Sequence, residues 1–467
     1  MGSNVVEPGD EAASSSAQRR REQRGWCWYD WANSVFPTSV ITVFLSLYLT
    51  EVAESAARAS GQPCADGSAL VDCDISLWGL SFPAGSLWGY LLSVATVVQV
   101  LVLPITGAIA DRTQNKRVML GGFAFAGAAA TSALALLAGT NWQLGVVLFI
   151  LANICFGGSV VVYYSFLPEI ADADERDGVS SRGWAFGYLG GGLALAFHLA
   201  LYLSHEALGL TEAEAVRWCF FTAGLWWAVF TLIPLARLRG HQPPQGSERG
   251  VAVFRAGFSQ LAQTLREAKS YPLTLGFLAA YLVYNDGIVT VTNVAGQYGE
   301  RELGLDRTVL ITTILIVQFI AFVGAVAHGR AARRFGAKRT IMGSLVLWVL
   351  VVGAAFFVEA GQEFQFYGLA VGIGLVLGGT NALSRSLFSQ LVPPGREAEY
   401  FSVYEVGERA TSWLGPLVFA AAGQATGSYR LAIVSLVVFF VVGLILVALV
   451  PVRRAIAAVG NRPPTVV

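Results

Sequence analysis

The stretch GAIADRTQNKR (residues 107–117) follows a long apolar segment, and a related stretch, GRAARRFGAKR (residues 329–339), occurs later in the chain. Both open on glycine, both end on Lys-Arg, and they lie 222 residues apart in a chain of 467. A weaker repeat follows each of them, ADERDGVSSRGWAFGYLGG (173–191) and PPGREAEYFSVYEVGERATSWLGP (393–416). The second half of the chain therefore repeats the first.

The composition indicates lipid as the solvent for most of the chain. Hydrophobic residues make up 55% and charged residues 13% of it, unlike an ordinary soluble protein. A spanning helix needs about 20 apolar residues to cross a bilayer core of about 30 Å. Such windows occur at 31–50, 86–110, 118–139, 144–168, 183–204, 218–236, 271–298, 308–329, 340–358, 364–384, 401–427 and 431–452. We expect an all-α integral membrane protein with twelve transmembrane helices in two six-helix pseudo-repeats.

Lys and Arg are distributed unevenly over the predicted loops. With both termini on one side, 25 of the 31 Lys and Arg lie on that side, five on the other and one within a helix. Because cells retain basic loops in the cytoplasm, the N and C termini are predicted to be cytoplasmic. The expected parts are a disordered N-terminus (1–25), two bundles (26–236 and 271–452), a linker with an amphipathic helix (237–270) and a tail (453–467) that ends disordered.

The five cysteines fit no metal-binding spacing. Cys27, Cys155 and Cys219 lie in or beside predicted helices. Cys64 and Cys73 share the first outer loop, and the sequence leaves open whether they form a disulfide, since this depends on whether that loop faces an oxidising space.

Common enzyme signatures are absent from the sequence. It holds no GxxxxGK[ST] loop, no HExxH and no paired CxxC, and GYLGGG (187–192) lies inside a predicted membrane helix rather than after a soluble strand. We expect no enzyme activity, no cofactor, no metal site and no nucleic-acid partner.

The loop pattern GxxxDRxxxKR, in a chain of twelve predicted helices, resembles the signature of the major facilitator superfamily over essentially the whole chain. Further stretches resemble its vacuole-effluxer-like branch, which includes the autophagy-related amino acid effluxer of yeast. In the second loop Arg333 stands where an acid often stands in that family, so the two halves are expected to gate differently. The branch-specific stretches are YDWANS (29–34), FLPEI (166–170), RGWAFGYLGGG (182–192), YNDGI (284–288) and NALSRSLFSQLVP (381–393).

This resemblance implies that helices one, four, seven and ten line a substrate cavity. An amino acid needs a cation for its carboxylate and an acid or carbonyl groups for its ammonium group, and Arg385 and Asp286 would supply one of each. The expected cavity residues are Asn33, Asn153, Tyr163, Tyr164, Asn285, Asp286, Asn293, Asn381 and Arg385.

Asp286 lies about halfway along the seventh predicted helix, where an ionised acid costs about 2.5 to 3.5 kcal/mol. Its neighbours Asn285 and Gly287 suggest a locally loosened helix whose backbone carbonyls bind a solute or an ion. Asp286 is therefore one candidate for carrying a coupled proton. The alternative is a buried ion pair with Arg385 or Arg409 that only holds helices together.

The eleventh predicted helix carries three charges. Glu405 and Arg409 are four residues apart with the acid first, which favours a local pair. Glu408 is then the second candidate proton carrier, or a partner for Arg385. His198, in the fifth helix, titrates near neutral pH or else simply hydrogen-bonds a neighbouring helix.

Charged residues at helix ends are predicted to gate the cytoplasmic mouth. Asp111 is expected to accept hydrogen bonds from free helix N–H groups or from an Arg of a neighbouring helix, or else to lie in a solvated turn. Asp30, within a belt of tryptophans and a tyrosine, is expected to close the mouth by bonding to Arg182, or else to stabilise a helix N-terminus. The predicted gating residues are Asp30, Gly107, Asp111, Arg112, Arg117, Arg182, Arg334 and Arg339.

We predict a secondary transporter of the efflux type that moves a small solute, an amino acid by family resemblance, across the membrane by alternating access, with proton coupling and the direction of transport left open. The alternatives are export of another metabolite or drug, and a non-transporting membrane sensor with the same fold. We expect a monomer in a lipid bilayer. Only three of the 31 basic residues are Lys, as in proteins of GC-rich bacteria, which indicates a bacterial plasma membrane.

Overall fold

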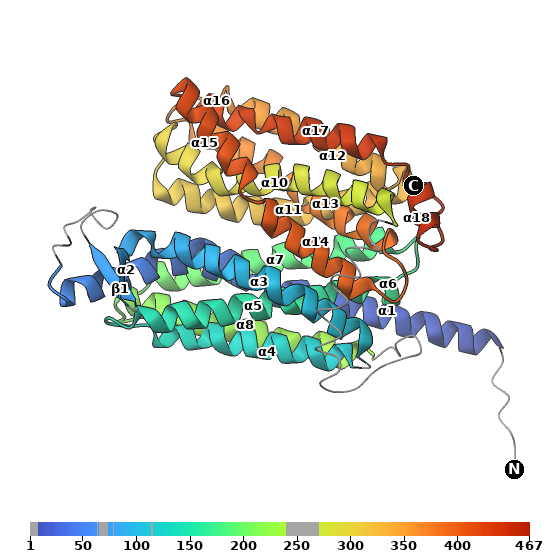
Figure 1. Ribbon diagram of the computed structural model, residues 1–467, viewed down its shortest axis with the longest axis horizontal. Helices are drawn as coiled ribbons and strands as arrows, with labels where there is room; N and C mark the ends of the chain where they lie inside the picture. The colour runs from blue at the N-terminus through green and yellow to red at the C-terminus, as the bar shows by residue number, and fades with distance from the viewer. Residues whose placement is uncertain (1–7, 63, 65–72, 78, 114, 240–269) are drawn as a thin grey trace, which may run out of the picture.

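The structure is a computed structural model that describes the chain except residues 1–7, 63, 65–72, 78, 114 and 240–269. Two bundles of long, nearly parallel helices lie side by side, one from each half of the chain (Figure 1). The linker predicted at 237–270, with its amphipathic helix, lies almost entirely outside the described residues.

The N-terminal bundle contains the elements of the first half. They are α1 (Pro8–Asn33), the π-helix η1 (Phe36–Leu45), α2 (Ser46–Ala59), β1 (Asp74–Leu77), β2 (Leu80–Pro83), the 3₁₀-helix η2 (Ala84–Ser86), α3 (Leu87–Arg112), α4 (Lys116–Ala133), the 3₁₀-helix η3 (Leu134–Leu136), α5 (Trp142–Ser165), α6 (Leu167–Ile170), α7 (Arg176–Leu203) and α8 (Glu212–Arg237).

The C-terminal bundle contains the elements of the second half. They are α10 (Pro272–Arg301), α11 (Arg307–Phe335), α12 (Ala337–Ala355), α13 (Glu363–Gln390), α14 (Glu397–Thr411), α15 (Leu414–Thr426), α16 (Tyr429–Ser435), α17 (Val437–Leu449) and α18 (Val452–Ala458).

Within the described residues, eleven helical stretches are long and apolar enough to cross a membrane. The eleventh predicted helix, at 401–427, is divided into α14 and α15. Pro416 explains the division, because proline lacks the N–H of an α-helical bond and its ring clashes with the carbonyl four residues earlier. Twelve crossings therefore stay a prediction.

The first span is continuous from Ser16 to Ala59 but changes its winding at η1. Pro37 lies in the first turn of η1, and the Thr42 hydroxyl donates to the Pro37 carbonyl at 2.8 Å. Proline disturbs the regular α-helical ladder at this position, and a π-helical winding accommodates it. The sequence analysis did not predict this segment.

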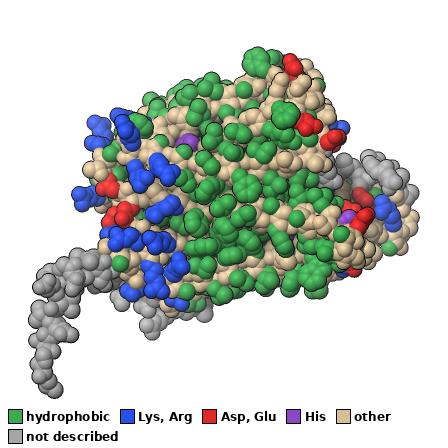
Figure 2. Space-filling view, turned by 180° about the vertical axis from the view of Figure 1, so that it is seen from behind, with side chains coloured by type: hydrophobic (Ala, Val, Ile, Leu, Met, Phe, Trp, Pro, Cys, Tyr) green, Lys and Arg blue, Asp and Glu red, His purple; other side chains and the backbone are tan. Residues whose placement is uncertain are grey.

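The surface has an apolar band between two polar ends, as a bilayer requires (Figure 2). Lys and Arg gather at one end, which we call the basic end; it carries the loop before α4 and the one before α12. The other end, which we call the opposite end, carries the β1–β2 hairpin (Figure 1).

Two expectations of disorder are wrong. Helix α1 begins at Pro8 and so includes residues 8–25, where Ala, Gln, Glu and Arg favour helix. The Gln23 amide fixes it by donating to the Ile170 carbonyl at 3.0 Å. The end of the chain is also placed, since the Asn461 amide donates to the Gln390 and Val392 carbonyls at 2.8 and 2.7 Å.

Helix α10 runs without interruption through residues 285–287, so the predicted loosening of the seventh helix is wrong. Gly287 serves packing instead. A Cβ atom there would lie 2.8 Å from the Cβ of Phe439 in α17, so glycine allows the two helices to approach closely.

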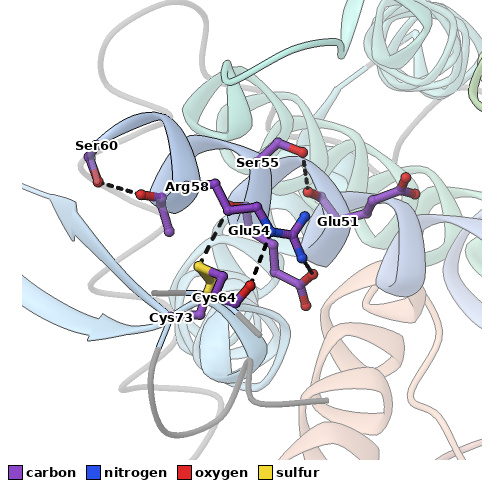
Figure 3. Close-up of a disulfide and its surroundings, with 8 residues drawn as sticks. Glu51, Glu54, Ser55, Arg58, Ser60, Cys64 and Cys73 are labelled. Carbon is purple, nitrogen blue, oxygen red and sulfur yellow. Dashed lines mark hydrogen bonds and ion pairs between the residues drawn. A yellow bond between two sulfur atoms is a disulfide. The ribbon is translucent and has the colours of Figure 1, made fainter. Parts of the chain in front are cut away.

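A disulfide joins Cys64 and Cys73 at the opposite end, with an S–S distance of 2.04 Å (Figure 3). This settles the pairing that the sequence left open. The bridge ties the end of α2 to the start of β1, and Arg58 and Glu54 form an ion pair at 3.3 Å beside it (Figure 3). The three other cysteines are free and buried.

Candidate functional site

Arg385, near the end of α13, is fully buried and ties the two bundles together. Its Nη1 donates to Asp30 Oδ2 of α1 at 3.1 Å. Its Nε donates to the Ser180 hydroxyl of α7 at 2.9 Å, and its Nη2 to the Ser180 carbonyl at 2.9 Å. A side chain of the C-terminal bundle is therefore held by two helices of the N-terminal bundle.

Four aromatic rings of the N-terminal bundle surround the Arg385 guanidinium. Its central carbon lies 4.7 Å from the ring centre of Trp26, 4.8 Å from Tyr164, 5.4 Å from Trp184 and 5.7 Å from Tyr163. Ring faces attract cations, most strongly away from water. We call Asp30, Ser180, Arg385 and these four aromatics the gate cluster.

The gate cluster also fixes the acid opposite Arg385. The Tyr163 hydroxyl donates to Asp30 Oδ2 at 2.8 Å. This oxygen therefore accepts hydrogen bonds from both the Arg385 guanidinium and the neutral Tyr163 hydroxyl. Removing one partner of a buried ion pair typically costs about 3–5 kcal/mol, because the other charge is left uncompensated. The cluster thus strongly favours the state in which the bundles meet here.

The predicted bond between Asp30 and Arg182 is wrong. Arg182 is exposed, and its Nε donates to the Gly178 carbonyl of its own helix at 3.1 Å. Two positions earlier, Ser180 points toward α13 and donates to the Ala382 carbonyl at 2.6 Å. The rotation of α7 about its axis decides which side chain reaches the other bundle.

A second layer of contacts joins the start of α7 to the end of α13. Arg176 Nη1 donates to the Ser389 carbonyl at 3.0 Å, and the Ser386 hydroxyl donates to Asp177 Oδ1. These residues lie nearer the basic end than the gate cluster, so this mouth is closed in two layers.

Asp111, at the end of α3, contacts the other bundle at a separate corner. Its two carboxylate oxygens accept the backbone N–H groups of Ala398 and Glu399 at 2.9 and 2.8 Å. These N–H groups lie in the first turn of α14, where no intrahelical partner exists. The predicted bonding of Asp111 to free helix N–H groups is confirmed, and the negative charge also suits the α14 macrodipole.

Gly107 permits this corner. A Cβ atom there would lie 2.5 Å from the Ala398 carbonyl oxygen, so the two helices meet backbone to backbone. Lys116, beyond the loop, contacts Asp111 at 3.5 Å and Glu169 at 2.6 Å.

The other predicted gating residues also lie at the basic end. Arg117 donates to the Leu238 carbonyl at 3.4 Å, inside its own bundle. The Arg334 guanidinium lies 5.6 Å from the ring centre of Phe335. Arg339 is exposed, and Arg112 is half-buried at the end of α3.

A cavity of about 760 Å³ lies between the bundles, toward the opposite end, and is partly open. Its lining includes Trp88 near the start of α3, Tyr298 near the end of α10 and Phe366 near the start of α13. Among the described residues, its lining holds no Asp, Glu, Lys, Arg or His. Hydroxyl and amide groups supply the polar contacts: Thr42, Ser46, Tyr188, Thr292, Asn293, Thr313 and Gln318.

Of the predicted cavity residues, Asn293 lines this cavity. The others, outside its lining in this conformation, are Asn33, Asn153, Tyr163, Tyr164, Asn285, Asp286, Asn381 and Arg385. Tyr188 connects the two regions, since it lines the cavity and its ring centre lies 5.6 Å from that of Trp184 in the gate cluster. Ser180, Trp184 and Tyr188 were not predicted from the sequence, although all three lie in the repeated stretch 173–191.

A third polar cluster lies where α3, α10 and α14 meet. Arg409 Nη1 donates to Glu405 Oε2 at 2.6 Å, which confirms the predicted local pair. Arg409 Nε also donates to Gln99 Oε1 of the N-terminal bundle at 2.5 Å. Glu408 accepts the Tyr281 hydroxyl at 2.9 Å, with Asn285 beside it.

Asp286 does not form the ion pair with Arg385 or Arg409 that we considered. Its Oδ2 accepts the backbone N–H of Gly415 at 2.7 Å, in the first turn of α15. Asp286 therefore stabilises the start of α15, after the break that divides the eleventh predicted helix. His198 bonds the Thr222 hydroxyl of α8 at 3.1 Å, a contact within one bundle.

Two helical bundles, closed together at one end and parted by a cavity toward the other, have the architecture of the major facilitator superfamily. The fold matches the crystal structure of the transporter FucP in its outward conformation with a TM-score of 0.63 and 13% identity, over 91% of this chain and 97% of that chain. The human organic anion transporter MFSD10 gives 0.64 and 14%, over 92% and 99%. Identities this low show the fold alone.

The chain belongs to the family described as vacuole effluxer Atg22 like, whose profile matches residues 18–460. It is 30% identical over 433 residues, 92% of this chain and 95% of the relative, to the uncharacterized MFS-type transporter YxiO of Bacillus subtilis. It is 25% identical over 566 residues, 96% and 92%, to autophagy-related protein 22-1 of Neosartorya fischeri. The protein is therefore a multi-pass membrane protein of this family, and its Bacillus relative is described as an MFS-type transporter.

Proposed function

We propose that this protein is a secondary active transporter that exports amino acids from the cytoplasm by alternating access. One observation carries the proposal: the gate cluster ties the bundles together at the basic end, while the cavity between them is partly open toward the opposite end. Alternating access requires that one mouth be closed while the other is open. This conformation fits one of the two required states.

The basic end would face the cytoplasm. The surplus of Lys and Arg supports this orientation, and so does the Cys64–Cys73 disulfide at the opposite end, since disulfides persist in oxidising spaces. The cavity would then open to the outside. The Bacillus relative supports a bacterial plasma membrane, and we expect the protein to act there as a monomer.

Amino acid specificity is supported by the family description and by the chemistry of Arg385. When the bundles part at the basic end, Arg385 loses Asp30 and its guanidinium becomes available to a substrate carboxylate. Asp286 and Glu408, both on the C-terminal bundle with Arg385, are the acids that would attract the ammonium group. The uncharged cavity lining places no counter-ion in the way of a net-neutral zwitterion.

Proton coupling is supported by the cluster around Glu408. Two carboxylates, Glu405 and Glu408, share the Arg409 guanidinium, which bonds Glu405. A second unneutralised carboxylate is costly inside a membrane bundle, so one proton on Glu408 would leave the cluster neutral. Because Arg409 also bonds Gln99 of the other bundle, a change of charge here would bear on the contact between the bundles.

Flux from proteoliposomes loaded with amino acids and common metabolites, with and without a pH gradient, tests the proposal. We expect the loss of a few amino acids from loaded vesicles, at least tenfold slower in Arg385→Ala, since a buried ion pair is broken. Arg182→Ala is the matched control, because this arginine is exposed and lies two residues from Ser180 on α7; it should change the rate less than twofold.

Glu408→Gln separates coupling from transport. We expect it to keep amino acid exchange but to lose the response to the pH gradient, because an amide side chain, unlike a carboxylate, does not take up and release a proton. Selective release of other metabolites from the vesicles would show that the substrates are not amino acids. Absence of any flux from folded protein would favour the membrane sensor, and a retained pH response in Glu408→Gln would rule out this acid as the carrier.

A further inference from the structure

The chain after α18 crosses the basic end in an extended form and is held to the C-terminal bundle. The Asn461 amide donates to the carbonyls of Gln390, the last residue of α13, and of Val392. Val452 and Ile456 of α18 are buried, so the helix itself is packed on the bundle. Residues 461–467, which we call the strap, thus start from a fixed point.

The strap then reaches the N-terminal bundle. The Thr465 backbone N–H donates to Asp174 Oδ1 at 2.6 Å, and the Thr465 hydroxyl donates to the same oxygen. Asp174 lies between α6 and α7, directly before the residues that bind α13. Figure 1 places α18 and the C-terminus beside α6, at the end where the bundles meet.

The strap also lies against the second of the two repeated loops, residues 329–339. A Cβ atom on Gly336, which has a φ of 85°, would lie 2.3 Å from the backbone carbon of Val467. Three residues earlier, Arg333 is exposed. The chain end therefore contacts the loop that lacks an acid equivalent to Asp111.

Any opening of the basic end must part these attachments, because one end of the strap is fixed to each bundle. The anchor at Asn461 moves with α13, whereas Asp174 moves with α7. From this placement we propose that the strap is an autoinhibitory contact that holds the basic end closed until Thr465 leaves Asp174. The inference rests on the alternating access proposed above.

The contact between Thr465 and Asp174 shifts the equilibrium toward the closed basic end without locking it. Asp174 is largely exposed, and exposed charged contacts contribute little. Hydrogen bonds from the Thr465 hydroxyl and then the Thr465 N–H lower the pKa of Asp174, so the carboxylate form is the one that holds the strap. Arg462 lies near it as the adjacent cation, and Arg453 contacts the Thr465 carbonyl at 3.5 Å.

A charge exchange in the full-length protein tests the strap. Thr465→Glu sets two acids against each other, and Asp174→Lys removes the acceptor; the double variant restores attraction with the signs reversed. Asp172→Lys is the control, because Asp172 pairs with Arg19 inside the N-terminal bundle. Spin labels at Asn115→Cys and Arg330→Cys, both exposed on opposite bundles at the basic end, report the separation.

We expect each single variant to raise the population with a wide separation about threefold, in keeping with an exposed contact, and the double variant and Asp172→Lys to match the parent. Single variants that match the parent would overturn the strap, as would a double variant that stays as open as the singles. A parent with one separation under every condition would instead refute the alternating access on which the strap depends.

Discussion

The two hinges, residues 107–117 and 329–339, share a sequence pattern but join the bundles by different means. In the first, Asp111 binds the N-terminal N–H groups of α14 across the bundle boundary. In the second, the equivalent position is Arg333, which is exposed, and the contact near that corner comes from the C-terminal strap.

This difference shows that the two repeated loops share the close approach of two helices but not the acidic residue beside it. Gly107 lies against the backbone of Ala398, and Gly329 lies against the side chain of Ser181. Both glycines let helices of opposite bundles meet. The acid is present on one side only, so one corner is closed by a buried carboxylate and the other by a longer, weaker connection.

The largest effect is expected from filling the two glycines. Gly107→Val should lower transport at least tenfold, because its side chain meets the backbone of α14, and overpacking of this kind costs about 1–3 kcal/mol. Gly329→Val should also slow transport, but Ser181→Gly should rescue it by removing the opposing atoms. Initial rates in proteoliposomes decide this, and a Gly329→Val that Ser181→Gly fails to rescue would contradict the assigned contact.

A smaller effect is expected from the charges at the two corners. Asp111→Ala removes an acceptor shared by two N–H groups and should favour the open basic end about tenfold, since charge-assisted bonds are the stronger ones. Arg333→Ala should change it less than twofold. The distance between spin labels on the two bundles at the basic end measures the open population of each variant. Equal effects of Asp111→Ala and Arg333→Ala would contradict the asymmetry between the two loops.

The smallest effect on the closing of the basic end is expected from lowering the pH. Because the pKa of Asp174 is lowered in the folded protein, its contact with Thr465 is present above the unfolded value of about 3.9 and is lost as pH falls through the lower folded value. The strap should therefore hold unchanged from pH 8 to pH 5. Wild type and Asp174→Ala should differ by a constant factor over that interval; a difference that vanishes between pH 8 and pH 5 would contradict the assignment.

The sequence allowed the helical architecture, the repeat and the bonding of Asp111 to free helix N–H groups to be predicted, because each depends on local pattern. The pair of Glu405 and Arg409 was also predictable from their spacing along one helix. Contacts between the bundles were not. Asp30 and Arg385 are 355 residues apart, and nothing local states that α7 turns Ser180 inward and Arg182 outward.

Irregular helices were also beyond the apolar windows used. The break between α14 and α15 had a visible signal in Pro416, but the eleventh window was treated as one span. The strap had no signal, because residues 460–467 have the composition of a disordered tail. Its order arises from side chains on distant helices, Asp174 and the end of α13 among them.

The π-helical winding of η1 has a mechanical consequence. It follows Asp30, which holds Arg385, and it contains Ile41 and Thr42, which line the cavity together with Ser46 directly after it. A π turn holds more residues than an α turn, so tightening this segment would rotate everything beyond it relative to Asp30 without breaking the rod. A change of winding in this one helix would then couple the orientation of the cavity side chains to the bond between Asp30 and Arg385.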